Sequence, residues 1–351
     1  MTDFYKVIQS QAIDALRFPM AVAVVFIHSG LRNSLGWDSH NDFLSNLLVF
    51  VINSILPAAV PLFFLISGFL FFLKMEHMSK TWYLFQMKKK CRTLLLPYMC
   101  WNLLAIPIFI LCVHDKNILS VFENIKVGDF FLLFWAYNGP YPLDLPLWFV
   151  RDLFILMLLS PIIYCALRKC KYLFLIIIAL LYLFVEKQLC GLSSTGLLYF
   201  SIGAFFSLSK DKQLFNIGRN AKGMIMLFFV GAIIIRYFYY DKFWIQRFYA
   251  LVLTFVIYQV FYICVQYRWV KVEPLLSKSS FFIFASHYLC VYGYSTALLR
   301  YIIPSSVSFF LTGEMKIMLS VALCCSICFA LYLFLYKSFP KLAGLLTGGR
   351  M

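Results

Sequence analysis

The sequence is poor in charged residues, and this scarcity sets the class of protein. Only 13% of its 351 residues are Asp, Glu, Lys or Arg, which is about half the roughly 25% of an ordinary soluble domain. Such a chain cannot coat a water-facing surface of its own size, so a soluble enzyme is excluded. Because 63% of the residues are hydrophobic, intrinsic disorder is excluded as well.

Several functional signatures are also missing. The sequence has no G-x-G-x-x-G or phosphate-binding P-loop motif, no low-complexity segment and no internal repeat visible by eye. Most of the 11 cysteines lie inside apolar runs, so we expect reduced thiols that behave as small apolar side chains. We expect no disulfide scaffold, no bound metal and no permanently bound cofactor.

What the chain does contain is a series of long apolar runs. A membrane-spanning helix needs about 20 apolar residues, and the sequence predicts ten such spans with short loops. The predicted fold is therefore an all-α, polytopic membrane helix bundle that forms a single domain over residues 1–351. The runs cover residues 12–31, 46–73, 92–113, 146–167, 172–187, 196–208, 223–240, 244–265, 280–301 and 315–336.

The basic residues predict the orientation of these spans. The formal net charge is +16, which in a soluble protein would suggest nucleic acid. In a membrane protein, Lys and Arg collect in cytoplasmic loops, so we expect no nucleic-acid partner. With the N-terminus in the cytoplasm, 20 of the 31 basic residues lie on the cytoplasmic side and 9 on the opposite side. We therefore predict a multi-pass protein of the cell membrane with both termini in the cytoplasm.

The first predicted span carries two ionisable side chains, Arg17 and His28. Eleven residues at 100° per residue place both on one helix face, about 16 Å apart along the axis. An ionisable group inside a bilayer costs at least about 2.5 kcal/mol on insertion scales and marks a functional candidate. The structural alternative is that Arg17 anchors the helix at the interface and that His28 is an interfacial aromatic residue.

Two further pairs are candidates at the next spans. Ser67 and Gly68, in PLFFLISGFLFF, permit close helix approach, and helix packing is their simplest role. Lys89 and Arg92 lie three residues apart in KKKCRTLLLPY and would share a helix face at the cytoplasmic surface. Such a pair is able to hold phosphates, although any cytoplasmic loop of a membrane protein is rich in basic residues.

The fourth and ninth spans also carry polar groups. The fourth begins PLDLPLWFVRDLF, with Arg151 and Asp152 beside Trp148. Adjacent residues on a helix diverge by 100° and do not face one another, so we expect each of the two to find a different partner. In the ninth span, His287 lies eight residues in from the predicted cytoplasmic side; its role is open.

Five segments in order resemble the acyltransferase family 3 integral membrane proteins. The first is DALRFPMAVAVVFIHS, in which Arg17, ten residues and then His28 match the hallmark spacing of that family. The others are PLFFLISGFL, KKKCRTLLLPY, PLWFVRDLF and SFFIFASHY. The resemblance covers nearly the whole chain. It departs from the family at Lys89, where many members have the first Arg of an Arg-x-x-Arg pair.

The resemblance implies an integral membrane O-acyltransferase. Its donor would be cytoplasmic acyl-CoA, most commonly acetyl-CoA, and its acceptor a hydroxyl of a carbohydrate or lipid-linked glycan. It implies that His28 is the general base, with Arg17, Lys89 and Arg92 near the CoA phosphates. Ser67 and Gly68 would then shape the donor site. The acceptor would lie near Arg151 and Asp152, with Trp148 stacked on a sugar ring.

Alternatives remain open at this point. An acyl-histidine intermediate would replace direct transfer. A transporter or flippase of a glycan or lipid-linked precursor would also have ten spans and intramembrane charges. The membrane-bound O-acyltransferases of a second type use an intramembrane histidine in a later helix, whereas here the first span carries one. The sequence identifies neither the acceptor, nor the acyl chain length, nor the oligomeric state.

Overall fold

The computed structural model of the chain is built of helices. It describes residues 2–29, 54–113, 127–135, 141–185, 192–209, 242–303 and 313–350, with isolated positions between 212 and 238. These residues include no β-strand, which confirms the predicted all-α fold. The helices are α1 (Thr2–His28), α3 (Ala59–Phe72), α4 (Lys80–Lys90), α5 (Leu96–Val113), α7 (Val127–Trp135), α8 (Trp148–Leu158), α9 (Ser160–Lys169), α10 (Lys171–Phe184), α11 (Ser194–Leu208), α13 (Phe243–Gln266), α14 (Pro274–Ser286), α15 (Tyr292–Ile302), α17 (Gly313–Ser338) and α18 (Pro340–Thr347).

Four short segments complete the secondary structure. Two are 3₁₀-helices, η1 (Leu56–Ala58) and η3 (Leu145–Leu147). Two are π-helices, η2 (Cys91–Leu95) and η4 (His287–Val291). A π-helical turn is rare and is frequently found at functional sites. Here η2 lies within one of the segments that resemble the acyltransferase family, and η4 begins in another.

The described chain divides into two compact units. The first unit comprises Met1–Met20, Pro57–Lys88 and Asp152–Ser277, and the second comprises Ala21–Leu56, Lys89–Arg151 and Lys278–Met351. The boundaries fall within α1, η1, α4, α8 and α14, so these five elements contribute residues to both units.

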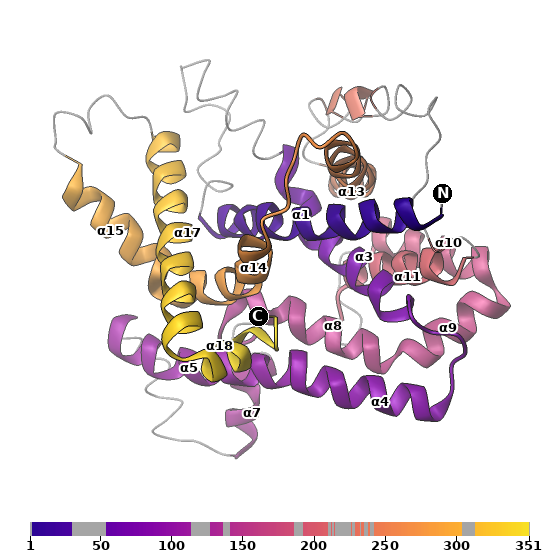
Figure 1. Cartoon of the computed structure of the whole chain (residues 1–351), viewed down its shortest axis with the longest axis horizontal. Coiled ribbons are helices and arrows are strands. Elements are labelled where there is room, and N and C mark those ends of the chain that lie inside the picture. The colour runs from indigo at the N-terminus through magenta and orange to yellow at the C-terminus, as the bar shows by residue number, and fades with distance from the viewer. Residues whose placement is uncertain are drawn as a thin grey trace. The chain divides into compact units, whose positions relative to one another are not determined.

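In the first unit, α3 and α11 form the most extensive helix contact (Figure 1). Glycine makes this close approach possible from both sides. A Cβ atom on Gly68 would overlap the backbone carbonyl of Phe200, and a Cβ on Gly203 would overlap that of Leu65. Small residues let helix backbones approach closely in membrane proteins. The packing role considered for Gly68 therefore has a specific partner, α11.

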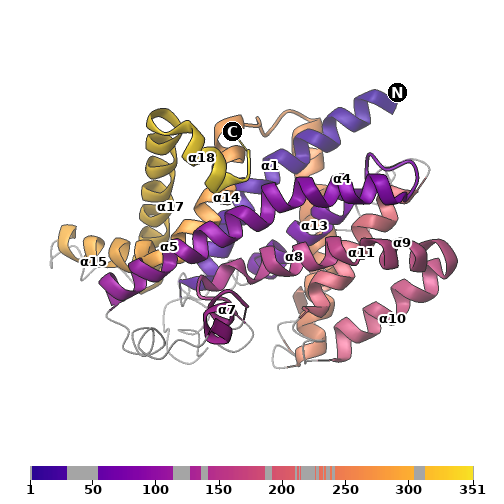
Figure 2. The same ribbon diagram turned by 90° about the horizontal axis from the view of Figure 1, so that it is seen from below.

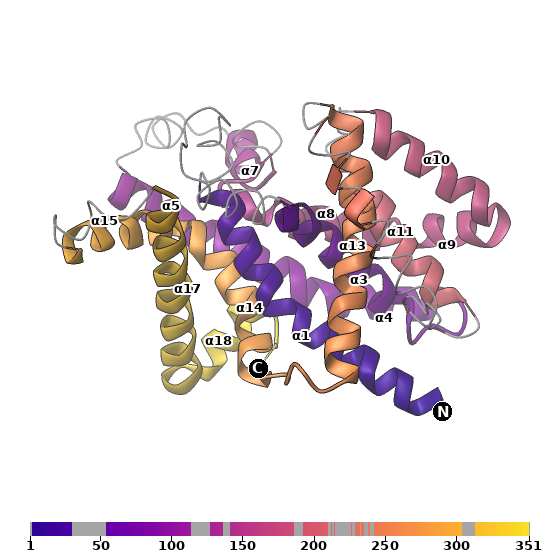
Figure 3. The same ribbon diagram turned by 90° about the horizontal axis from the view of Figure 1, so that it is seen from above.

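Arg247 of α13 fixes the end of α10, and both helices belong to the first unit (Figure 3). Its Nη1 donates hydrogen bonds to the carbonyl oxygens of Tyr182 and Val185, the latter at 3.0 Å, and to Ser194 Oγ at 3.3 Å. Its guanidinium lies 4.0 Å from the ring centroid of Phe243. A cation bound to the last carbonyls of a helix stabilises its C-terminus, so Arg247 has a structural role.

The second unit is built around α5, η4, α15, α17 and α18. Helices α14, α15 and α17 are neighbours in Figure 2, and α17 contacts both η4 and α15. Trp101 of α5 donates a hydrogen bond at 3.0 Å to the carbonyl of Leu346 in α18. Gly348 ends α18 in the left-handed conformation, with φ of 66°, and fits against the backbone of Thr93. This unit carries His28 and His287.

Several of the described helices are suited to a membrane. Four are long and apolar enough to cross one, and two bent pairs raise the number to six if each pair is a single span. Three further apolar helices are shorter. The predicted span 223–240 lies mostly outside the described residues. The helices indicate a multi-pass membrane protein, and the count of ten spans stays a prediction.

Candidate active site

His28 is the last residue of α1, and a backbone carbonyl fixes the proton on its ring. Its Nδ1 lies 2.9 Å from the carbonyl oxygen of Val24, one turn earlier in the helix. A carbonyl oxygen only accepts hydrogen bonds, so Nδ1 carries a hydrogen, and in the neutral imidazole Nε2 then carries the lone pair. His28 in this tautomer presents an unprotonated nitrogen, as a general base requires.

A second histidine lies against the first. His287 begins the π-helix η4, is fully buried, and places its Nε2 3.2 Å from Nδ1 of His28. The two ring centroids are 5.2 Å apart. The Nδ1 of His287 lies 3.2 Å from the carbonyl oxygen of Ile283. Sequence reasoning noted His287 from its place inside an apolar span but missed its pairing with His28, for which the sequence holds no signal.

Aromatic side chains of η4 and α15 surround the pair. The ring of Tyr288 meets that of His28 edge-on, with centroids 5.6 Å apart. Tyr292 donates a hydrogen bond at 3.2 Å to the backbone carbonyl of Ser29, which directly follows His28. These contacts hold the C-terminal end of α1 against η4 and α15 and so fix the position of the imidazole.

Sequence reasoning missed Asp144, whose buried carboxyl group lies in the same unit as His28. Its backbone N–H donates to Asn102 Oδ1 at 3.1 Å, while neither carboxylate oxygen has a hydrogen-bond partner among the described residues. Burial raises the pKa of this carboxyl well above its usual range, so the neutral form is favoured. An unpartnered buried carboxylate calls for an explanation, and a ligand hydroxyl is one group that would satisfy it.

Arg151, Asp152 and Trp148 have separate environments, as their spacing predicts. Arg151 is 4% exposed, donates through Nη1 to the backbone carbonyl of Trp135, and lies 5.1 Å from the Trp135 ring centroid. The rings of Trp148 and Tyr141 meet edge-on, with their centroids 6.4 Å apart. Both belong to the second unit, with His28.

Asp152 belongs to the first unit and has a structural partner there. Its Oδ2 accepts a hydrogen bond at 3.0 Å from the backbone N–H of Ser193. Ser193 is the N-cap of α11, and a carboxylate near a helix N-terminus is stabilised by the helix dipole. The contact gives Asp152 a structural role at the start of α11, and its expected place near the acceptor stays a prediction.

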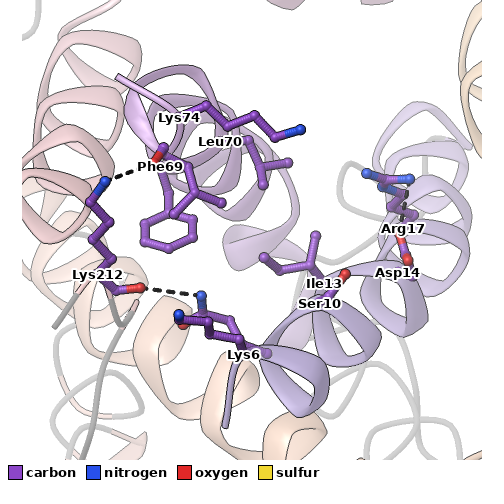
Figure 4. A pocket seen from close by; sticks show the side chains of 11 residues that line it. Lys6, Ser10, Ile13, Asp14, Arg17, Phe69, Leu70, Lys74 and Lys212 are labelled. Carbon is purple, nitrogen blue, oxygen red and sulfur yellow. Dashed lines mark hydrogen bonds and ion pairs between the residues drawn. The ribbon is translucent and has the colours of Figure 1, made fainter. Parts of the chain in front are cut away.

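Arg17 lies in a basic pocket of the first unit. The pocket has a volume of about 390 Å³ and includes Lys6, Lys74 and Lys212 in its lining (Figure 4). Arg17 also pairs with Asp14 at 2.9 Å. Sequence reasoning assigned Arg17 to an anion site but missed these three lysines. Lys74 and Lys212 come from distant parts of the chain, whereas Lys6 lies eleven residues before Arg17 on α1, a spacing that places both on one helix face.

Lys212 is held at the rim of this basic pocket in an uncommon backbone conformation. Its φ is +46°, a region costly for residues other than glycine. Gln9 binds the backbone that follows it: Gln9 Nε2 donates to the Lys212 carbonyl at 3.4 Å, and Gln9 Oε1 accepts from the Leu214 N–H at 2.8 Å. The Lys212 Nζ donates to the carbonyl of Leu73 at 3.2 Å. Strained residues held in this way cluster at ligand sites.

The remaining candidates lie elsewhere. Gly68 packs on α11, and Ser67 is half-buried on α3. Neither lines the basic pocket, to which α3 contributes Phe69 and Leu70. Lys89 and Arg92 are exposed and flank the junction of α4 with the π-helix η2 in the second unit.

The described residues offer no arrangement suited to a metal ion. Cys325 and Cys328 have the C-x-x-C spacing within α17, but no group of three or more His, Cys, Asp or Glu side chains in the described part of the chain is placed to hold a metal. Neither of these two cysteines forms a disulfide. The absence of a bound metal from the reaction stays a prediction.

Comparison with known proteins identifies one family. A family model described as an acyltransferase domain, Acyl_transf_3, matches residues 10–338. The matched segment extends across both compact units and includes Arg17, His28 and His287. No curated protein and no solved structure is significantly similar to the chain.

Proposed function

Since the chain belongs to the acyltransferase 3 family, we propose that it is a membrane O-acyltransferase that uses cytoplasmic acyl-CoA, with acetyl as the acyl group. The acceptor in this proposal is a hydroxyl of a cell-surface carbohydrate or lipid-linked glycan. The observation that carries the proposal is the contact of His28 Nδ1 with the Val24 carbonyl oxygen at 2.9 Å. In the neutral ring this contact makes Nε2 the unprotonated nitrogen, on a residue that matches the family's hallmark spacing.

His28 would act as the general base. An alcohol is a poor nucleophile, and a neutral imidazole within hydrogen-bonding reach takes its proton during attack. The acceptor oxygen bonds to the thioester carbonyl carbon while its proton passes to His28 Nε2. The C–S bond then breaks, and the CoA thiolate takes the proton from Nε2. The products are an ester and CoA thiol, and the enzyme is regenerated.

The basic pocket around Arg17 would hold the phosphates of the donor. It combines a guanidinium with the ammonium groups of Lys6, Lys74 and Lys212, and both kinds of cation bind phosphate. Arg17 and His28 belong to one uninterrupted helix, α1. Eleven residues of helix extend about 16 Å, a distance that an extended pantetheine arm would cover. Lys89 and Arg92 would attract the donor at the membrane surface.

The acceptor would be bound in the second unit. Trp148 would stack on the apolar face of a pyranose ring. The buried Asp144 carboxyl, which has no side-chain partner among the described residues, would bind a sugar hydroxyl. Arg151 would support this surface through Trp135, whose carbonyl it already binds.

Analysis of the surface glycans of cells tests the proposal. Mass spectrometry would compare glycans from cells without the gene, with the gene, and with the His28→Ala variant. We expect acyl groups on one glycan hydroxyl only in cells that carry the unaltered gene. Equal acylation in cells carrying His28→Ala, at matched protein levels in the membrane, would contradict the role of His28.

A second experiment addresses the donor site. Lys212→Met and Lys74→Met remove positive charge from the basic pocket while keeping side-chain length. If the pocket holds the CoA phosphates, each variant raises KM for acetyl-CoA by about tenfold, because a hydrogen bond to a charged group contributes about 1.5–3 kcal/mol, and kcat changes little. An unchanged KM in both variants would place the donor elsewhere.

A further inference from the structure

The proposed base, His28, is in contact with a second histidine, His287. A general base does not by itself require such a partner. Burying an imidazole costs free energy unless its nitrogens find partners. His287 is fully buried, and its two nitrogens meet the Ile283 carbonyl and the His28 ring, each at 3.2 Å. The second histidine is thus committed on one side to its own helix and on the other to the proposed base.

The two carbonyl contacts determine every proton in the pair. The Ile283 carbonyl only accepts, so Nδ1 of His287 carries a hydrogen and its Nε2 carries a lone pair. The Val24 carbonyl likewise requires a hydrogen on Nδ1 of His28. That hydrogen is shared between the Val24 carbonyl at 2.9 Å and His287 Nε2 at 3.2 Å.

From this geometry we infer that His287 is a positioning residue for His28. It accepts the Nδ1–H of His28 and so keeps the reactive nitrogen, Nε2, unprotonated and fixed in direction. When Nε2 takes the acceptor proton, the ring becomes positively charged and its hydrogen bond to His287 strengthens, because charge-assisted bonds are roughly twice as strong as neutral ones. The inference rests on the proposed function.

The role corresponds to that of the third residue in a Ser-His-Asp triad, which holds the imidazole in the correct tautomer and stabilises its protonated form. Here the third group is neutral. A neutral acceptor orients His28 without adding a negative charge to the apolar interior, where an unpaired charge is expensive. The proton stays on His28 throughout the step, and His287 neither gains nor loses one.

Two substitutions of His287 separate this role from simple packing. In His287→Gln, the side-chain amide oxygen reaches the position of Nε2 and still accepts from His28. In His287→Asn, the shorter amide reaches only the position of Nδ1, so it keeps a donor for the Ile283 carbonyl and loses the contact with His28. Both side chains are polar amides, which makes them a matched pair.

The assay uses the full-length protein in proteoliposomes made with membrane lipids extracted from cells that lack the gene, which supply the acceptor. Acetyl-CoA labelled in the acetyl group is the donor, and label recovered as glycan ester gives kcat and KM. We expect His287→Gln to keep kcat within about tenfold and His287→Asn to lose about a hundredfold in kcat, since a positioned base contributes about 10²–10⁴-fold. KM for acetyl-CoA should change less than threefold in both, because His287 does not bind the donor.

The outcomes separate the inference from the proposed function. If the unaltered protein transfers no label, or His28→Ala transfers as much as the unaltered protein, the proposed function fails. If His28→Ala is inactive and the Gln and Asn variants have equal kcat, only the positioning role is overturned. A loss in His287→Asn that appears in KM alone, or a loss of folded protein alone, also overturns it.

Discussion

At the scale of single residues, the site is defined by what buried polar groups bind. His28 and His287 each donate to a carbonyl of their own helix and meet each other across 3.2 Å. Arg151 and Asp152 are adjacent in sequence but belong to different compact units. Their divergence was predictable, because neighbours on a helix point 100° apart. The pairing of the two histidines was not, because no local pattern connects residues 259 positions apart.

Asp144 should make stability depend on pH. Burial raises the pKa of its carboxyl in the folded protein, whereas the unfolded chain ionises near pH 4. Above that pH the unfolded state releases the proton more readily, so ionisation favours unfolding as pH rises. Asp144→Asn removes this penalty. Thermal unfolding in detergent between pH 5 and 8 should show Tm of the variant rising relative to the unaltered protein as pH increases.

The informative quantity is how the difference in Tm between Asp144→Asn and the unaltered protein changes with pH, and not the size of that difference at one pH. A change in packing caused by Asn shifts Tm by the same amount at every pH, so packing alone cannot create a difference in Tm that grows with pH. A difference in Tm that stays constant, or that shrinks as pH rises, would contradict a carboxyl that is more easily protonated in the folded protein.

At the scale of helices, apolar runs predicted most elements but not their irregularities. The run 146–167 predicts one span, whereas the structure has α8 and α9 with a bend of 59° at Leu159. Pro161 in the first turn of α9 explains the bend, since proline suits a helix start and disrupts a helix interior. The π-helix that begins at His287 contains neither proline nor glycine to mark it in the sequence. Helix α1 begins well before its apolar run, at Thr2, where polar residues line the basic pocket.

The contact between α3 and α11 should be intolerant of any side chain at Gly203. Its Cβ would overlap the backbone carbonyl of Leu65, and neither backbone has a flexible atom to move. Gly203→Ala should lower the free energy of unfolding by at least about 1–3 kcal/mol, the usual cost of overpacking. Thermal unfolding in detergent measures this as a lower Tm.

Gly293 provides the matched control. It also lies in a helix, but a Cβ there meets nothing within 4 Å. Gly293→Ala should raise stability slightly, because alanine is about 1 kcal/mol more favourable than glycine in a helix interior. Equal effects of the two substitutions would show that the close approach at Gly203 does not limit stability.

At the scale of the whole molecule, the charge distribution predicts topology. The junction of α9 and α10 carries basic residues and an exposed cysteine, Cys170, on the predicted cytoplasmic side. A variant with Cys170 as its single cysteine should react with a membrane-impermeant thiol reagent in inside-out vesicles but not in intact cells. A single cysteine placed at Lys242, on the predicted outer side, should show the opposite pattern.

If both positions gave the opposite labelling pattern, the orientation in the membrane would be the reverse of the predicted one. It would also move the basic pocket to the side of the membrane that has no acyl-CoA. The topology measurement therefore bears on the reaction as well as on the fold.

The central claim is that this chain transfers an acyl group from CoA with His28 as the base. Its most direct test is a single assay of the purified protein in proteoliposomes with labelled acetyl-CoA and extracted glycolipid acceptor. The account predicts one CoA thiol released for each glycan ester formed, and loss of both in His28→Ala with the protein still folded. Ester formation that persists in His28→Ala, or transport of the glycolipid without ester formation in the unaltered protein, would contradict it.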